Sequence, residues 1–248
     1  MSAAVAETRS RLPYWVLLGI ALAIAWGLYA SGLGADMLRY RKDIVYLTKQ
    51  HLVLVAISGS AAIIAGTALG IWLSRPWMAR WADGAIQAVN MLTSIPTLGK
   101  LALMMTLLGI GALPAIVGLW IATLLPIIRN TYEGIRAVPA HLVDAAHGMG
   151  MGPSAILARV EIPNALFVIF AGVRTAMAVN VGTAPIAFLI GGGGLGELIF
   201  TGIDLQQHGM MLAGAIPTAL LAVAVDFLFG QAQYWLVPRG VNPLRNSG

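Results

Sequence analysis

The chain contains few side chains that could perform catalysis or bind a metal, and their spacing favours neither. It has no cysteine, which excludes disulfides and thiolate metal sites. Its serines and threonines stand beside no base that would activate a hydroxyl nucleophile. Two of its histidines, His141 and His147, miss the i, i+4 spacing with which a helix presents two metal ligands. The other two are far apart in the sequence, so we expect no enzymatic active site and no metal site.

Two glycine-containing stretches invite a nucleotide-binding interpretation, and both lack what such a site needs. A P-loop reads Gly-x4-Gly-Lys-Ser/Thr. Around the Gly-Lys pair at residues 99–100, serine replaces the first glycine and leucine replaces the hydroxyl residue. Residues 191–196 satisfy GxGxxG, but they follow a long apolar run and lack a βαβ context. We interpret them as a flexible turn between a membrane span and a re-entrant segment, and expect no cofactor in this chain.

Polar side chains recur instead along one face of an apolar segment: Asn90, Thr93, Thr97 and Lys100 follow the spacing i, i+3, i+7, i+10. Pro96 removes a backbone hydrogen bond there, which membranes tolerate where the break lines a cavity or is covered by protein. A lysine at membrane depth costs about 2.5–3.5 kcal/mol on insertion scales. We predict that these residues line a translocation pathway. The alternatives are that the hydroxyls bond between helices and that Lys100 extends toward the outer headgroups.

A later apolar segment carries Asn180 and Thr183 among small residues. Small residues permit close helix packing, so pathway lining and a packed helix interface both stay open for this face. Arg174 and Asp226 lie in the inner thirds of two different apolar segments. Because isolated charges are expensive at that depth, we predict that these two side chains pair.

The composition is that of a lipid-embedded chain. Hydrophobic residues make up 58% of the 248 residues, 10% are charged, and the mean hydropathy is +0.82. A soluble domain normally has about 25% charged residues, so too few are present to solvate a surface of this size. The net charge of +5 comes from dispersed basic residues, a distribution that serves membrane topology rather than nucleic-acid binding.

Six apolar segments are each near the length that crosses about 30 Å of hydrocarbon, which predicts an all-α integral membrane protein with about six transmembrane helices. They cover residues 14–30, 50–73, 86–110, 113–128, 164–190 and 209–236. The first, preceded by Arg9 and Arg11, is alternatively a cleaved signal peptide. Residues 36–50 have apolar positions at helical spacing and are expected to form an amphipathic helix on the outer membrane face.

The distribution of basic residues predicts the orientation. Six spans place both termini on one side, and assigning that side to the cytoplasm gives it most of the arginines that lie outside the spans. The outer side then receives basic residues only in the loop 36–50, which opposes the rule. We expect both termini, and residues 144–163, to lie in the cytoplasm.

Residues 144–163, DAAHGMGMGPSAILARVEIP, interrupt the apolar sequence with polar residues. Their pattern resembles the EAA loop of bacterial ABC importer permeases: Glu-Ala-Ala, three residues, Gly, nine residues, Ile-x-Leu-Pro. Every spacing is kept, although Asp, Val and Ile replace Glu, Ile and Leu. The resemblance implies a short cytoplasmic helix that docks on an ATPase subunit. The residues it implicates are Asp144, Ala145, Ala146, Gly150, Val160, Ile162 and Pro163. Gly148, Gly150 and Gly152 are expected to let the docking helix turn sharply.

Further segments are similar to osmoprotectant permeases of that family. Residues 93–98 resemble their Gln-Thr-Ile-Pro-Ser-Leu, and residues 124–131 match their Leu-Leu-Pro-Ile-Val-Arg-Asn-Thr. The resemblance implies a MetI-like permease subunit in a bacterial inner membrane, for glycine betaine, carnitine, choline or a similar solute. It implies a second permease (the same or a related chain), two ATPase subunits that bind ATP and Mg²⁺, and an extracytoplasmic substrate-binding protein.

Two departures bear on the substrate. Lys100 stands where an apolar residue is usual, and Thr93 where glutamine is usual. A fixed cation would repel choline and attract the carboxylate of a betaine. A permease for another small solute, such as an amino acid, and an ion-coupled secondary transporter are the alternatives.

The chain divides into an N-terminal span and outer loop (1–49), a permease core (50–236) and a cytoplasmic tail (237–248).

Overall fold

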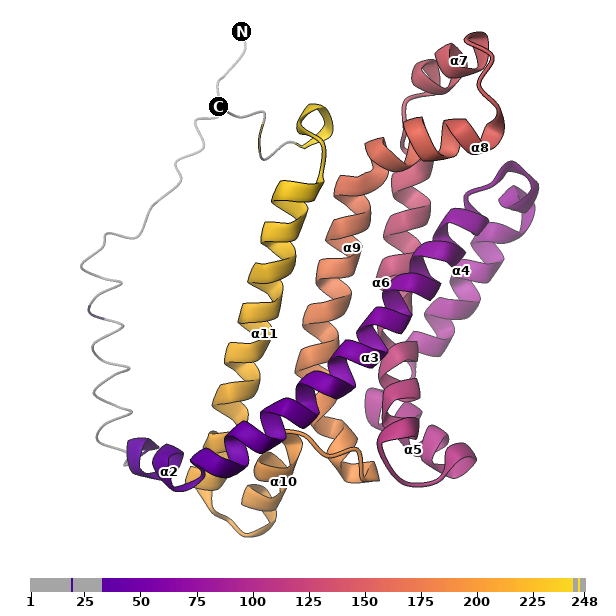
Figure 1. The fold of residues 1–248 in the computed structure, drawn as a ribbon. Helices are drawn as coiled ribbons and strands as arrows, with labels where there is room; N and C mark the ends of the chain where they lie inside the picture. The colour runs from indigo at the N-terminus through magenta and orange to yellow at the C-terminus, as the bar shows by residue number, and fades with distance from the viewer. Residues whose placement is uncertain (1–18, 20–32, 243–244, 246–248) are drawn as a thin grey trace, which may run out of the picture.

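The computed structural model describes residues 33–242 together with residues 19 and 245, and within them the chain is helical with no β-strand (Figure 1). Four helical segments are long and apolar enough to cross a membrane: Arg41–Leu73, Ala112–Arg136, Pro153–Ile190 and His208–Leu236. A bent helix pair brings the number to five among the described residues. The predicted span 14–30 lies outside them, apart from Gly19.

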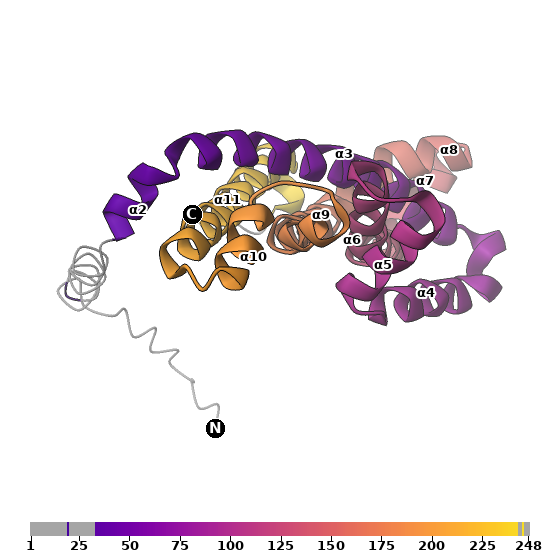
Figure 2. The same cartoon turned by 90° about the horizontal axis from the view of Figure 1, so that it is seen from below.

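The bundle is built on α3 (Arg41–Leu73), α6 (Ala112–Arg136), α9 (Ile162–Thr183) and α11 (His208–Leu236). Figure 2 shows α3 along one side of the row formed by α11, α9 and α6, with α4, α5 and α10 on the other side. Glycines allow the close approach of α3 and α9 to α6. A Cβ added at Gly70 would lie 2.8 Å from the Ile128 carbonyl oxygen, and one at Gly172 would lie 2.7 Å from the Pro126 carbonyl oxygen.

The predicted span 113–128 was too short. In the structure α6 continues through Pro126 to Arg136, because a proline is tolerated in a membrane helix whose neighbours hold it in place. The side-chain amide of Asn130, one turn after Pro126, donates to the Pro126 carbonyl at 2.8 Å.

The predicted span 86–110 is broken at Pro96, as expected. After a short turn η1 (Pro76–Met78), α4 (Ala79–Ser94) and α5 (Thr97–Leu108) meet at an angle of 92°. The helix begins several residues before the predicted start, because Arg80 and Asp83 lower the hydropathy of its first turns without preventing a helix.

Residues 36–50 are helical with the expected apolar stripe, but they do not form an amphipathic helix of their own on the membrane face. A short helix α2 (Leu33–Arg39) is followed directly by α3, whose first turns include the rest of this segment. Its apolar stripe packs against protein around α10 (Gly196–Asp204) and the start of α11. The stripe consists of Met37, Tyr40, Ile44 and Leu47, and its partners are Leu195, Leu198, Met210 and Ala213.

The two ends of the bundle carry different features. At one end, α7 (Ala140–Gly148), α8 (Pro153–Ile156) and a π-helical turn η2 (Leu157–Glu161) extend beyond the long helices, and η4 (Arg239–Val241) follows α11 there (Figure 1). At the other end lie η3 (Ala184–Ile190), the glycine-rich turn and α10. The polar segment 144–163 and the glycine-containing turn 191–196 therefore lie at opposite ends of the bundle.

Candidate functional site

The loop between α6 and α9, which we call the tip (residues 140–161), owes its shape to a helix end. Gly150 has φ 77°, its N–H donates to the His147 carbonyl at 2.9 Å, and the Met151 N–H donates to the Ala146 carbonyl at 3.1 Å. These two bonds are those of a Schellman motif, with glycine in the left-handed position. Only Gly150, of the three glycines expected to allow a sharp turn, has a positive φ.

The structure separates the predicted docking residues into two groups. Asp144, Ala145 and Gly150 are exposed on the tip, while Ala146 is buried beneath them. The second group, Val160, Ile162 and Pro163, is half-buried where η2 joins α9. An exposed Met149 stands between the exposed residues of the first group; the sequence analysis did not single it out.

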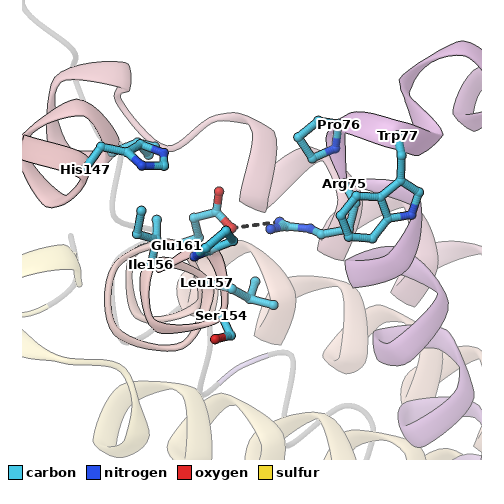
Figure 3. A pocket seen from close by; sticks show the side chains of 10 residues that line it. Arg75, Pro76, Trp77, His147, Ser154, Ile156, Leu157 and Glu161 are labelled. Carbon is cyan, nitrogen blue, oxygen red and sulfur yellow. Dashed lines mark ion pairs between the residues drawn. The ribbon is translucent and has the colours of Figure 1, made fainter. Parts of the chain in front are cut away.

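A cleft of about 530 Å³ lies between the tip and the turn from α3 to α4 (Figure 3). Its lining is mainly apolar. The residues are Arg75, Pro76, Trp77, Val143, His147, Pro153, Ser154, Ile156, Leu157 and Glu161.

Across this cleft, Arg75 pairs with Glu161: Nη2 lies 2.7 Å from Oε2, and the two side chains are 13% and 17% exposed. Arg75 is oriented by Ser74, whose Oγ accepts from the same Nη2 at 2.9 Å. The pair ties the end of α3 to the π-helical turn that leads into α9. π-Turns occur frequently at functional sites. A displacement of the tip would therefore reach α9 directly and reach α3 and α4 through Arg75. Nothing in the sequence spacing signalled this contact.

Lys100 has a structural contact that neither sequence interpretation anticipated. Its side chain is 5% exposed, and Nζ donates to the Thr93 carbonyl at 3.1 Å. The bend at Pro96 leaves the last carbonyls of α4 without their usual helical partners, and a cation is favourable at the negative end of a helix. Lys100 thus covers the broken helix from inside the protein.

The rest of the α4–α5 stripe is more accessible. Asn90 and Pro96 are exposed, and Thr93 and Thr97 are half-buried. Asn90 also lines a polar hollow of about 200 Å³ between α4 and α6.

Asn180 belongs to a packed helix contact. It is fully buried, and its Nδ2 donates to the Ser58 Oγ at 2.9 Å, which joins α9 to α3. Ser58 in turn donates to the Leu54 carbonyl at 2.8 Å. The packed interface is therefore the interpretation that the geometry of Asn180 favours. Thr183, one turn further, is half-buried and bonds to the Val179 carbonyl of its own helix at 2.8 Å.

The predicted pairing of Arg174 with Asp226 is confirmed. Nε donates to Oδ1 at 2.6 Å and Nη2 donates to Oδ2 at 2.6 Å, which is the bidentate geometry of the strongest guanidinium–carboxylate pairs. The pair joins α9 to α11. Its side chains are 42% and 40% exposed, so both charges are accessible.

Comparison with known proteins identifies similar sequences across most of the chain. The profile of the family described as binding-protein-dependent transport system inner membrane component matches residues 62–240. The chain is 46% identical over 210 residues to the osmoprotectant import permease protein OsmY of Salmonella typhimurium, covering 84% of this chain and 89% of that protein. It is 38% identical to the choline transport system permease protein OpuBB of Bacillus subtilis, covering 82% and 93% respectively.

Two more comparisons agree. The glycine betaine/carnitine/choline transport system permease protein OpuCB of Bacillus subtilis is 37% identical, covering 82% of this chain and 93% of its own length. A solved structure of the MetNI methionine ABC transporter in an inward-facing conformation matches with a TM-score of 0.68 and 23% identity, covering 80% of this chain and 96% of that chain. At that identity the structural match shows the fold alone, which is MetI-like.

The contact between Lys100 and Thr93 predicts a specific loss of stability. Lys100→Met should lower the free energy of unfolding by about 2 kcal/mol, because a hydrogen bond from a charged donor to the Thr93 carbonyl is lost. Unfolding of the purified protein in detergent micelles measures this. The matched control is Lys49→Met, since Lys49 is exposed on α3. Equal stability of the two variants would contradict a structural role for Lys100.

Proposed function

Because the chain belongs to the family of binding-protein-dependent transport system inner membrane components, it is a non-catalytic, multi-pass permease subunit of an ABC importer, and we propose that its solute is a small osmoprotectant such as glycine betaine. The observation that carries the substrate class is the 46% identity to an osmoprotectant import permease over 84% of the chain. Two further relatives whose names include choline support the same class.

The family works with an ATPase and a substrate-binding protein. We propose the assembly of two ATPase subunits, two permeases and one binding protein, with ATP and Mg²⁺ bound by the ATPases. The tip is the proposed ATPase contact, because it extends beyond the bundle and exposes Asp144, Ala145 and Gly150. The opposite end, with the glycine-rich turn and α10, is the proposed contact for the binding protein.

The proposed orientation places the tip and both termini in the cytoplasm. Basic residues gather at the tip end of the described helices, as the positive-inside rule requires of the cytoplasmic side. They are Arg75 after α3, Arg80 at the start of α4, Arg136 at the end of α6, Arg159 in η2 and Arg239 after α11.

The proposed mechanism is alternating access. Closure of the ATPase dimer displaces the tip; η2 conveys the displacement to α9, and the pair of Arg75 with Glu161 conveys it to the α3–α4 turn. When α4 moves, α5 moves with it, because Lys100 joins α5 to the last turn of α4. The pathway then opens outward to receive the solute.

We propose that the pathway is lined by the accessible members of the polar stripe: Asn90, Thr93, Pro96, Thr97 and, on α9, Thr183. The buried side chains of Lys100 and Asn180 support this lining from behind, through the Thr93 carbonyl and Ser58 respectively.

Reconstituted transport tests the substrate class. The complex of this permease with its ATPase and binding protein, placed in vesicles that contain ATP, is expected to accumulate labelled glycine betaine and not labelled methionine. Accumulation of methionine without any glycine betaine, carnitine or choline would contradict the proposed substrate class while leaving the family assignment unchanged.

Gly150 is predicted to be needed for coupling. Gly150→Leu should abolish ATP-driven uptake while the permease remains in the membrane. The left-handed conformation costs a side chain about 1–2 kcal/mol, and the leucine would also project from the exposed docking surface. Uptake and ATP hydrolysis are measured together in vesicles.

The matched control is Gly109→Leu. Gly109 has φ 83° and ψ −169°, a conformation at least as unfavourable for a side chain, and open space around it, but it lies at the end of α5, away from the tip. It should keep the number of solute molecules imported per ATP hydrolysed. Normal uptake by Gly150→Leu would show that the tip does not dock as proposed.

A further inference from the structure

The pair of Arg174 and Asp226 is more open than an ion pair inside a membrane span needs to be. Arg174 is twelve residues after the start of α9 and Asp226 ten residues before the end of α11. At 1.5 Å per residue, these positions lie about 18 Å and 15 Å from the tip end of the bundle. Charged side chains at such depth face a protein interior or a wet cavity rather than lipid. The 42% and 40% exposure of the two side chains leaves both charges accessible.

Two adjoining hollows meet at this pair. One, of about 490 Å³, is lined on α11 by residues that include Phe227 and Gln231. The other, of about 580 Å³, is lined on α9 by residues that include Thr175. Both are open hollows at the surface of the chain. Arg174 and Asp226 line both hollows, so both charges are open to a solute in either one.

The space beside the guanidinium is kept open by a glycine. A Cβ added at Gly230 would lie 3.5 Å from both the Cζ and the Nη1 of Arg174. Any larger side chain at this position would cover that edge of the guanidinium, which carries N–H donors not used by Asp226.

We propose that Arg174 and Asp226 form a transient binding site for a zwitterion that carries a carboxylate and a quaternary ammonium group, on the tip side of the pathway. The guanidinium binds the carboxylate through its planar fork. The Asp226 carboxylate and the face of Phe227, which is 61% exposed in the same hollow, bind the ammonium. The inference deepens the proposed function and rests on it.

Charge balance gives this site its selectivity. A zwitterion replaces each partner of the internal pair with an opposite charge, so neither Arg174 nor Asp226 is left unpaired when it binds. A purely cationic solute such as choline satisfies Asp226 alone and leaves the guanidinium without a counter-charge at membrane depth, which is unfavourable. Lys100 does not fill this role, because its ammonium is buried against the Thr93 carbonyl.

Competition between glycine betaine and choline tests the site. The complete complex is reconstituted in vesicles of phosphatidylglycerol alone, so that no zwitterionic lipid headgroup competes for the pair. Arg174→Gln should lower the betaine-to-choline uptake ratio about tenfold or more, because only betaine loses a partner. Asp226→Asn should raise the ratio, because choline is then left with no charged partner, whereas betaine still binds Arg174 through its carboxylate.

Opposite shifts from the two variants are the result that supports the site. A purely structural pair would change the uptake of both solutes by the same factor, and an unchanged ratio in both variants would overturn the proposal. Lys42→Gln and Asp43→Asn serve as charge-matched controls, since both residues are exposed at the far end of α3, and they should leave the ratio unchanged.

Failure of the site and failure of the proposed function are distinguishable. An unaltered complex that imports neither betaine nor choline contradicts the function. If the unaltered complex imports betaine but neither variant changes the betaine-to-choline ratio, the result contradicts the site alone.

If the neutralised variants do not assemble, Phe227→Leu removes the aromatic face and leaves the ion pair intact. It should lower the uptake rate of both solutes several-fold at saturating solute and binding protein, and an unchanged rate would overturn the proposal.

Discussion

The structure depends on one constraint of the membrane: a backbone N–H or C=O in hydrocarbon must find its partner within the protein. Three irregular points among the described residues are accordingly covered by a partner from elsewhere in the chain. Lys100 covers the carbonyl end of α4 at the Pro96 break. At the glycine-rich turn, the Gly194 N–H donates to Gln50 Oε1 at 3.1 Å. The Ile190 carbonyl accepts from Gly111 at 2.9 Å. The irregular segments are therefore tied to specific neighbouring helices.

The proposed mechanism uses these ties to transmit a small movement from one end of the bundle along the proposed pathway. The tip joins α9 through the π-turn and joins α3 through Arg75, so it does not move alone. The same need to satisfy buried charge makes the pair of Arg174 and Asp226 informative. An ion pair with buried charges would serve packing alone, whereas the charges of this pair are accessible from two hollows. In our proposal, Lys100 gives structural support and Arg174 contacts the solute.

The sequence predicted features whose cause is local or general. Pro96 bends its span, charges in lipid need partners, and the resemblance of the 144–163 loop to an importer permease is confirmed by the family match. Features that depend on neighbours were missed. Periodicity identified the stripe that includes Leu47 but not whether lipid or α10 and α11 would cover it. Likewise, the donor to the Thr93 carbonyl and the partner of Arg75 emerge only once the helices are assembled.

The most direct test of the account is cross-linking between this permease and its ATPase, since the chain contains no cysteine and single cysteines can be placed freely. Met149→Cys on the tip is 74% exposed, and Leu205→Cys after α10 at the opposite end is 57% exposed. With a single cysteine in the ATPase cleft, the account predicts a cross-link from Met149→Cys and none from Leu205→Cys. A cross-link from Leu205→Cys, with none from Met149→Cys, would contradict both the docking site and the orientation.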